Sequence, residues 1–305
     1  MKKVLVLGGN GFIGQNLCKY LLEMGECVYS FDMALPKTRI DGISYLDGDF
    51  FDDYTLKKVI EGMDVIYHAI CTLNPGNSNE KCILGYERDF VQTAKLCSWI
   101  MNTNTKMIFF SSGGTVYGNQ EIQPIKEDAV PVPINHYGNL KLCIENTIRT
   151  FNFQSKKNML IARISNPYGP GQDYLKGVGF IDAALKHAIH GEPIDVWGDG
   201  SVVRDYIYID DLCKMLYALM QYKGEEVVFN LSSGVGASQK DILNIINKLV
   251  PDVEIKYSPA RKVDAKKIVL DNSKISTLNV KAETDISYGI QKYYNYIIDT
   301  RDERK

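Results

Sequence analysis

The amino-acid sequence predicts an α/β protein in which a doubly wound parallel sheet is followed by a smaller C-terminal α/β domain. Short, almost continuously apolar runs alternate with amphipathic stretches over residues 1–165. Such runs are typical of parallel strands that helices cover on both faces. Beyond that point the pattern changes to the Pro- and Gly-rich connection NPYGPGQD and to more mixed elements.

The strands of the first domain follow one another along the chain. Five apolar runs predict them: KVLVL (3–7), CVYSFD (27–32), DVIYHA (64–69), MIFFSS (107–112) and MLIARI (159–164). Helical patterns fill the intervals, among them YTLKKVIEGM, which opens at Asp52 or Asp53, and YERDFVQTAKLCSWIM. This β-α-β-α order assigns residues 1–165 to one domain.

The second domain is predicted over residues 166–305. It contains a helical pattern near 179–190, a turn at WGDGS, and Ser238 followed by Asp241, which predicts a capping box before ILNIINKL. Strands near 204–232 are expected to rejoin the first sheet. Asn230, at the end of one of them, is interpreted as structural.

Composition narrows the classes of partner. The chain has 305 residues, 24% of them charged, and a formal net charge of -2, so it lacks the basic stripe that nucleic acid requires. A small molecule is the expected partner. No apolar segment is long enough to cross a membrane. Seven scattered cysteines without a C-x-x-C pair indicate reduced core residues of a cytosolic protein and no metal site.

A glycine turn joins the first strand to the first helix in VLVLGGNGFIGQNL. Gly9, Gly11 and Gly14 fit G-x-G-x-x-G, and Gly8, Gly11 and Gly14 fit a G-x-x-G-x-x-G variant. In either reading the backbone comes close to a pyrophosphate seated on a helix N-terminus. The position of the turn after a clean first strand predicts a Rossmann dinucleotide site.

Asp32 ends the second strand, 18 residues after Gly14, where a ribose-binding acid is expected. Its carboxylate would bond the adenosine ribose diol and repel a 2′-phosphate, which favours NAD over NADP. Lys37 and Arg39 lie nearby and leave NADP as the alternative. Asp49, after the next strand, is expected to accept from the adenine amino group with Phe50 beside the ring, or else to cap the following helix.

Tyr137 stands four places before Lys141 in the opening turns of a predicted helix. Spacing alone does not make the pair catalytic, because Tyr54 and Lys58 repeat it. The helix of Tyr137 follows the strand-end loop MIFFSSGGTVYG, whose hydroxyls, Ser111, Ser112 and Thr115, are expected beyond the C-terminal edge of the sheet. We therefore assign Tyr54 and Lys58 to solvent and the later pair to chemistry.

These motifs resemble those of the extended short-chain dehydrogenase/reductases that act on nucleotide sugars, such as the UDP-hexose 4-epimerases. The resemblance runs along nearly the whole chain. It implies that Tyr137 is the acid/base at a sugar hydroxyl, that Lys141 lowers its pKa and holds the nicotinamide ribose, and that Asn166 anchors substrate. A phenol of pKa about 10 needs a shift of roughly three units to act at neutral pH.

The resemblance also adds residues at the cofactor. These are Phe12 and Ile13 in the glycine turn, and His68 and Ala69 in a cofactor-facing loop, in addition to Gly8, Gly11, Gly14, Asp32, Asp49, Phe50, Ser111, Tyr137 and Lys141. His68 ends a strand and His136 precedes the tyrosine without a partner acid, so both are interpreted as structural rather than as bases.

Two positions depart from the family pattern. Gly113 stands where the family has its catalytic Ser or Thr, and Asp89 stands where a helix usually offers Asn. Thr115 or Ser112 is expected to supply the missing hydroxyl. Dehydration is not expected, because Gly114 and Thr115 replace the Asp and Glu of the nucleotide-sugar dehydratases.

The second domain carries residues expected at a nucleotide-sugar diphosphate. In GDGSVVRDYIYIDDL, Arg204 matches a diphosphate-binding arginine, and a guanidinium suits phosphate through bidentate bonds. Arg261 matches a second such arginine, and Asp264 is placed on the nucleoside ribose. Surface salt bridges are the alternative for this second pair.

The sequence therefore predicts an NAD-dependent nucleotide-sugar 4-epimerase, acting on a UDP-hexose or UDP-N-acetylhexosamine through a transient 4-keto sugar. The alternative is an NAD(P)H-dependent reductase of a 4-keto-6-deoxy nucleotide sugar, linked to dTDP or GDP. A non-catalytic dinucleotide sensor is a third possibility, suggested by Gly113. The resemblance further implies a homodimer built from the helix of Tyr137 and residues 86–101.

Overall fold

The structure is a computed structural model that describes residues 1–156, 158–173, 179–259 and 265–302. Seven parallel strands form the main sheet in the order β10-β6-β5-β4-β1-β2-β3. Their bounds are β1 Lys3–Leu7, β2 Cys27–Asp32, β3 Ile43–Asp47, β4 Val65–His68, β5 Lys106–Ser112, β6 Met159–Ile164 and β10 Val228–Leu231. This confirms the predicted doubly wound α/β fold.

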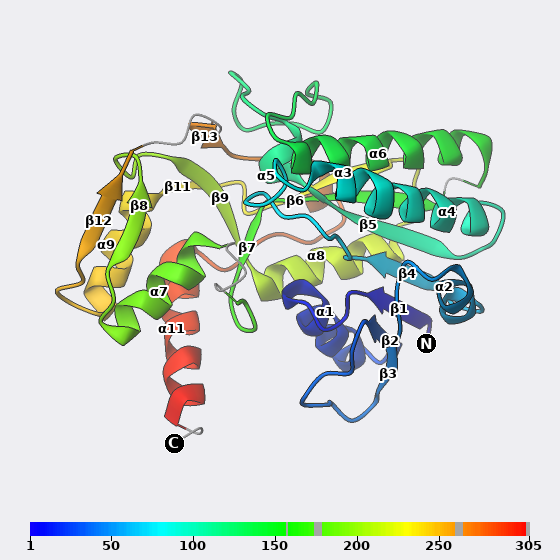
Figure 1. The fold of residues 1–305 in the computed structure, drawn as a ribbon, viewed down its shortest axis with the longest axis horizontal. Helices are drawn as coiled ribbons and strands as arrows, with labels where there is room; N and C mark the ends of the chain where they lie inside the picture. The colour runs from blue at the N-terminus through cyan, green and yellow to red at the C-terminus, as the bar shows by residue number, and fades with distance from the viewer. Residues whose placement is uncertain (157, 174–178, 260–264, 303–305) are drawn as a thin grey trace.

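Helices cover both faces of the main sheet. Figure 1 shows α4 (Val91–Ile100) and α6 (His136–Gln154) on one side, and α1 (Phe12–Glu23) and α8 (Ile209–Gln221) on the other. Successive residues of β1 serve the two faces, since Val4 and Val6 belong to one buried cluster and Leu5 and Leu7 to the other. A strand buried on both faces must be apolar throughout, which is why KVLVL does not alternate.

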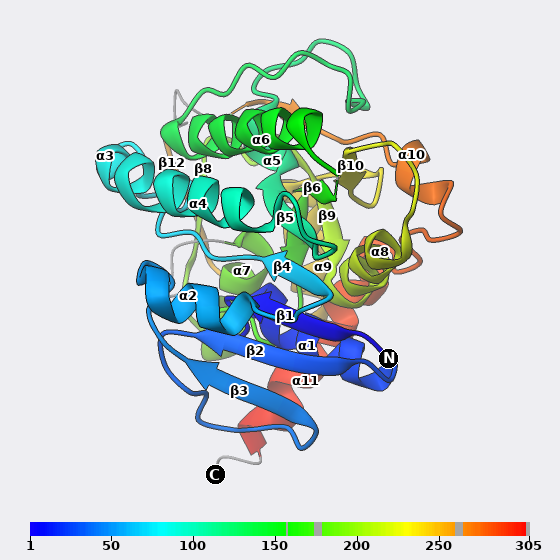
Figure 2. The same cartoon turned by 90° about the vertical axis from the view of Figure 1, so that its right-hand side faces the viewer.

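The remaining helices are short or lie toward the C-terminus. They are α2 Asp53–Ile60, α3 Cys82–Leu84, the π-helical turn η1 Gly85–Phe90, α5 Gly113–Val116, α7 Phe180–His190, α9 Gln239–Leu249, α10 Ser273–Ser276 and α11 Ile286–Asp302. In Figure 2, α2 lies beside β1 and β2. No helix in the described part of the chain combines the length and the apolar character needed to cross a bilayer.

Strands between residues 166 and 268 form two smaller sheets. In one, β9 (Val203–Tyr208) pairs with β7 (Asn166–Tyr168), β11 (Gly236–Ser238) and β13 (Lys267–Ile268). In the other, β8 (Ile194–Trp197) pairs with β12 (Ile255–Ser258). Figure 1 places β8, β12, α7 and α9 apart from the main sheet.

The expected return of strands 204–232 is right for one strand and wrong for the other. β10 pairs with β6 at the edge of the main sheet, whereas β9 pairs in the smaller sheet. The reason lies after β6, where β7 leaves the main sheet and offers its edge to β9 in parallel register, Asn166 opposite Tyr206. Such pairing between distant strands has no local pattern in the sequence.

The buried carboxylate of Asp205 ties β9 back to the main sheet. It accepts from Ser233 N at 2.9 Å and Gly234 N at 3.1 Å, in the loop after β10, and from Leu270 N at 3.2 Å. Burial raises its pKa, while these donors favour the charged form. Two distant chain segments therefore bind one side chain of β9.

Helix caps follow the sequence. Asp52, not Asp53, is the N-cap of α2 and accepts from Thr55 N at 2.8 Å. Ser238 and Asp241 form the predicted capping box of α9. Asn135 caps α6 by accepting from Gly138 N at 2.8 Å, which fixes where the helix of Tyr137 begins.

Candidate active site

A cavity of about 360 Å³ lies at the C-terminal ends of the strands, as expected for an open α/β sheet. Twelve residues predicted from the sequence line it: Gly8, Gly11, Phe12, Ile13, Gly14, Ala69, Ser111, Ser112, Thr115, Tyr137, Lys141 and Asn166. Cys71, Asn74 and Pro75 also line it and were not predicted. We call this cavity the cleft.

The glycine turn has the backbone that a pyrophosphate site needs. Gly8 has a φ of +86°, in the region that favours glycine. A Cβ on Gly14 would lie 2.1 Å from Gly8 O, so only glycine lets α1 pack this closely on the turn. Gly11, the N-cap of α1, has no side chain to occupy the free N–H groups. These residues fit a dinucleotide phosphate.

Asp32 stands where the ribose of a dinucleotide is expected. Its Oδ2 accepts from Asn10 N at 3.0 Å and its Oδ1 from Met33 N at 2.9 Å. Asp32 remains partly exposed at the end of β2. The two backbone bonds orient the carboxylate and leave it lone pairs for further donors.

Asp49 and Phe50 differ in where their side chains lie. Asp49 is half-exposed, accepts from Phe51 N at 2.9 Å and lies 3.9 Å from Arg88. The ring of Phe50 is buried among core residues, with its centroid 5.0 Å from that of His68. Phe50 is therefore a core residue, and the expectation that its ring lies beside the adenine is wrong.

Tyr137 and Lys141 meet in the cleft. Lys141 is 2% exposed, and its Nζ donates to Phe110 O at 2.8 Å and lies 5.6 Å from the centroid of the Tyr137 ring. A Cβ on Gly138 would lie 2.5 Å from Thr115 O, so this glycine lets α6 approach the strand-end loop. Tyr54 is 77% exposed and Lys58 is exposed, which confirms their assignment to solvent.

Burial and charge act in opposite directions on this pair. Burial raises the pKa of Tyr137, and the Lys141 ammonium lowers it without outweighing burial. The expected lowering by Lys141 is therefore right in direction, but the pKa of Tyr137 stays above its usual value. A second positive charge near the phenol would bring it further down.

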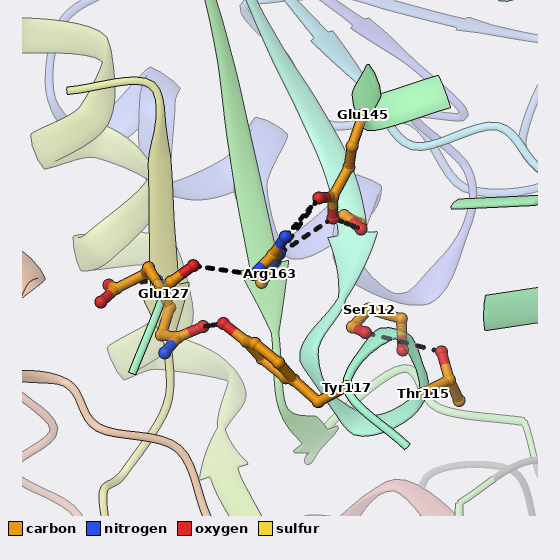
Figure 3. Close-up of polar contacts among 8 residues, drawn as sticks. Ser112, Thr115, Tyr117, Glu127, Glu145 and Arg163 are labelled. Carbon is orange, nitrogen blue, oxygen red and sulfur yellow. Dashed lines mark hydrogen bonds and ion pairs between the residues drawn. The ribbon is translucent and has the colours of Figure 1, made fainter. Parts of the chain in front are cut away.

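The hydroxyls near Tyr137 come from Ser112 and Thr115. Both line the cleft, and Thr115 Oγ1 donates to Ser112 O at 3.5 Å (Figure 3). A Cβ on Gly113 would lie 2.3 Å from Leu270 Cδ1 and would point into the core. In this backbone a serine at 113 would meet Leu270, so Gly113 fits its surroundings.

A buried ion pair holds Ser111, a residue of the cleft lining, and was not predicted from the sequence. Arg163 and Glu145 are fully buried, with Arg163 Nη2 2.6 Å from Glu145 Oε2. Ser111 Oγ donates to Glu145, and Arg163 Nη1 donates to Glu127 O at 3.2 Å (Figure 3). The arginine inside the apolar run MLIARI could have indicated this ion pair.

Asn230 lies in the same region and accepts from Tyr117 OH at 2.7 Å, consistent with its structural assignment.

A second cavity of about 270 Å³ adjoins the cleft through Asn166, which lines both. Arg204, Trp197, Tyr206 and Gln239 also line it. Arg204 Nη1 donates to Ala265 O at 2.7 Å, which fixes one side of the guanidinium. Arg261 and Asp264, the other predicted substrate residues, lie outside the described residues.

His68 is a core residue. Its side chain is 1% exposed, and Nε2 lies 2.9 Å from Thr93 Oγ1. It does not line the cleft, whereas the next residue, Ala69, does. The buried side chain, at the end of a fully buried strand, agrees with the structural interpretation of His68, and a cofactor contact through its backbone stays a prediction. His136 pairs with Tyr86 OH at 3.2 Å.

His68 should make stability depend on pH. Burial lowers its pKa to about 3 from 6.5, so between these values the unfolded chain binds a proton that the folded protein does not. Stability from this group is complete above pH 6.5 and falls as the pH drops. From pH 6.5 to pH 5 wild type should lose about 2 kcal/mol more than His68→Gln, measured by urea unfolding. Equal losses in both proteins would contradict this.

Comparisons with known proteins agree with this geometry. Residues 4–232 match the model of the NAD dependent epimerase/dehydratase family. A dTDP-4-dehydro-6-deoxyglucose reductase of Escherichia coli is 30% identical over 288 residues, covering 88% of each chain. A UDP-glucose 4-epimerase of Halalkalibacterium halodurans is 27% identical over 297 residues, covering 90% of this chain and 89% of that protein.

The fold comparison gives the same result. A crystal structure of UDP-glucose 4-epimerase with UDP-glucose from Thermotoga maritima superposes with a TM-score of 0.91 at 26% identity, over 98% of this chain and 99% of that one. The chain therefore belongs to the NAD dependent epimerase/dehydratase family, and NAD is the cofactor that its glycine turn fits.

Proposed function

We propose that the protein is an NAD-dependent nucleotide-sugar 4-epimerase acting on a UDP-hexose or a UDP-N-acetylhexosamine. The observation that carries this proposal is that Asn166 lines two adjoining cavities. One holds the glycine turn with Tyr137 and Lys141, and the other holds Arg204. A ligand that spans both would place a sugar at Tyr137 and its diphosphate toward Arg204.

Each residue has a distinct role in the proposed reaction. NAD, when bound, supplies the hydride acceptor for carbon 4 of the sugar. Tyr137 Oη removes the proton of the 4-hydroxyl and returns it after the sugar has turned. Lys141 stays protonated, held by Phe110 O, and stabilises the phenolate. Lys141 is buried and Tyr137 half-buried, and low exposure strengthens these charge interactions.

Arg204 is proposed as the diphosphate ligand. Val203 O and Ala265 O each accept from Nη1, so the guanidinium is oriented before a ligand arrives. Charge-assisted bonds from an oriented guanidinium favour phosphate oxygens. Asn166 donates through Nδ2 to Asp205 O at 2.9 Å, which leaves its Oδ1 for substrate hydroxyls. Arg261 and Asp264 keep their proposed roles, as a second arginine at the diphosphate and as an acid at the nucleoside ribose.

The E. coli relative favours one alternative. It is a dTDP-4-dehydro-6-deoxyglucose reductase, so the same residues could serve net reduction of a 4-keto sugar. In that reaction Tyr137 would donate its proton to the 4-keto oxygen in one direction only. The cofactor would then have to leave after each turnover.

Cofactor stoichiometry separates the two functions. Purified protein that carries bound NAD and interconverts UDP-glucose with UDP-galactose, or their N-acetyl forms, without added cofactor would support the epimerase. Consumption of one NADH per 4-keto-6-deoxy sugar nucleotide, with no interconversion of the UDP-sugars, would instead establish the reductase.

The family resemblance also underlies our proposal of a cytoplasmic homodimer built on α4 and α6.

Ser112 and Thr115 can be distinguished by single hydroxyl deletions. Ser112 Oγ would lie 3.9 Å from a Cβ on Gly114, which itself would lie 3.5 Å from Asn166 Oδ1. These distances support a role for Ser112 on the substrate side of the cleft, so Ser112→Ala should lower kcat by roughly 10-fold or more through loss of a hydrogen bond in the transition state. Thr115→Val, of matched volume, should lower kcat less. The reverse order in steady-state assays would assign the hydroxyl to Thr115.

A further inference from the structure

A buried carboxylate that the proposed reaction does not use lies beside the cleft. Asp89 is 2% exposed and lies on the π-helical turn η1, directly before α4. Single π-helical turns inside helices occur frequently at functional sites. Aspartate is rarely this buried unless its charge is paired, so a role for the charge has to be sought among its neighbours.

One oxygen of Asp89 fixes a loop of the cleft. Its Oδ2 accepts from Thr72 N at 2.9 Å, from Thr72 Oγ1 at 2.8 Å and from Cys71 Sγ at 3.5 Å. Burial raises the pKa of Cys71, which keeps this thiol protonated and able to donate. Cys71, Asn74 and Pro75 line the cleft, so Asp89 orders the segment that forms this wall.

The other oxygen has no partner within the described residues. Asp89 Oδ1 is buried and accepts no hydrogen bond there. An unpaired carboxylate oxygen in a low-dielectric site acts on nearby charges more strongly than it would in water. It also represents a cost to folding, unless the charge compensates a buried cation.

The buried cation of the same cleft is Lys141, which lines it together with Cys71, the thiol that donates to Asp89. Burial alone lowers the pKa of Lys141, but Cys71, Tyr137, Asp89 and Glu145 together raise it above the usual value. Glu145 is already engaged by Arg163. This leaves Asp89 as the carboxylate available to Lys141 among these four groups.

The other titratable groups around Asp89 do not replace it. His68 is neutral, because burial lowers its pKa to about 3. Arg88 is exposed, with its guanidinium 4.0 Å from the Phe51 ring centroid, on the side of Asp49. Glu87 is exposed. Of the charged groups considered, Lys141 and the Tyr137 phenolate, when that forms, are those that line the cleft whose wall Asp89 holds.

We propose that Asp89 is a positioning residue that acts on the reaction through Lys141 and Tyr137, by holding one negative charge beside them and by fixing the loop of Cys71 and Thr72. This proposal rests on the proposed function in naming Tyr137 as the acid/base. The charge favours the Lys141 ammonium and opposes the Tyr137 phenolate. It moves the ionisations of both groups toward higher pH.

The Asp89→Asn substitution tests the charge of this side chain apart from its shape. The amide keeps an acceptor for Thr72 and a similar volume but removes the charge. Both limbs of the pH profile of kcat/KM should move to lower pH, by about half a unit to one unit. A residue that only maintained the loop would lower the height of the profile and leave both limbs in place. Thr72→Val is the matched control, because it removes one donor and keeps the charge, and it should leave the limbs unmoved.

A titration without substrate tests the same inference independently of the proposed function. The ultraviolet absorbance of Tyr137 ionisation, taken as the difference between each protein and its Tyr137→Phe counterpart, should have a lower midpoint in Asp89→Asn. If Asp89→Asn does not fold, Asp89→Ser removes the same charge with a smaller side chain. Equal midpoints with and without the charge would overturn the proposal. A shifted midpoint in a protein that lacks epimerase activity would support it and refute the proposed function alone.

Discussion

Tyr137→Phe is expected to lower kcat by two or more powers of ten while leaving the affinity for NAD close to that of wild type. The substitution removes only the phenol oxygen, and with it the proposed proton transfer, which typically contributes about 100-fold to 10,000-fold. The ring would keep its packing and its place over Lys141, whose Nζ stays bonded to Phe110 O. Steady-state rates and NAD titration by fluorescence measure the two quantities separately.

The chain supplies its own control for this substitution. Tyr54 repeats the spacing to a lysine, at Lys58, but is 77% exposed and distant from the cleft lining. Tyr54→Phe should change kcat by less than about twofold. Turnover that survives in Tyr137→Phe would show that another group transfers the proton and would remove the basis for the proposed mechanism.

Glu145→Gln is expected to cost about 3–5 kcal/mol of unfolding free energy, because it leaves the buried Arg163 without a counter-charge. Both side chains are fully buried, and Arg163 Nε lies 3.1 Å from each oxygen of Glu145. The glutamine preserves volume and one acceptor, so the loss reports mainly the charge. Urea unfolding at pH 7 measures it, with intrinsic fluorescence as the probe.

An exposed ion pair is the matched control. Asp210 and Lys292 lie 2.6 Å apart, with side chains 49% and 45% exposed. Asp210→Asn should change stability by at most about 1 kcal/mol, because solvent screens exposed charges. A Glu145→Gln loss as small as that of the control would mean that water or a rearranged neighbour compensates Arg163. The ion pair would then not be a determinant of the fold.

The elements found from the sequence are those with a local cause. The five apolar runs became strands because these strands are largely buried between two layers of helices, and the glycine turn has a recognisable pattern because a side chain at Gly14 would block the approach of α1. The residues that line the cleft follow from strand ends and helix starts. Asn135 and Gly138, for example, set where the helix of Tyr137 begins.

What the sequence did not indicate depends on contacts between distant residues. The inward turn of Phe50 and His68 is set by core packing between β4 and its neighbours, and the pairing of β9 by an edge that only exists once β7 has left the sheet. The partner of Arg163 lies 18 positions away on another element. Asp89 was noted as a departure in the sequence, but its burial became apparent only in the folded chain.

The binding of two distant chain segments by Asp205 limits how the protein can be recombined with its relatives. A chimera that takes β9 from one parent and the segment carrying Ser233, Gly234 and Leu270 from another would present a buried acid to donors that evolved around a different partner. Crossover points between β9 and these segments would therefore give poorly folding hybrids. Exchanging everything from β9 onward as one block would preserve these bonds.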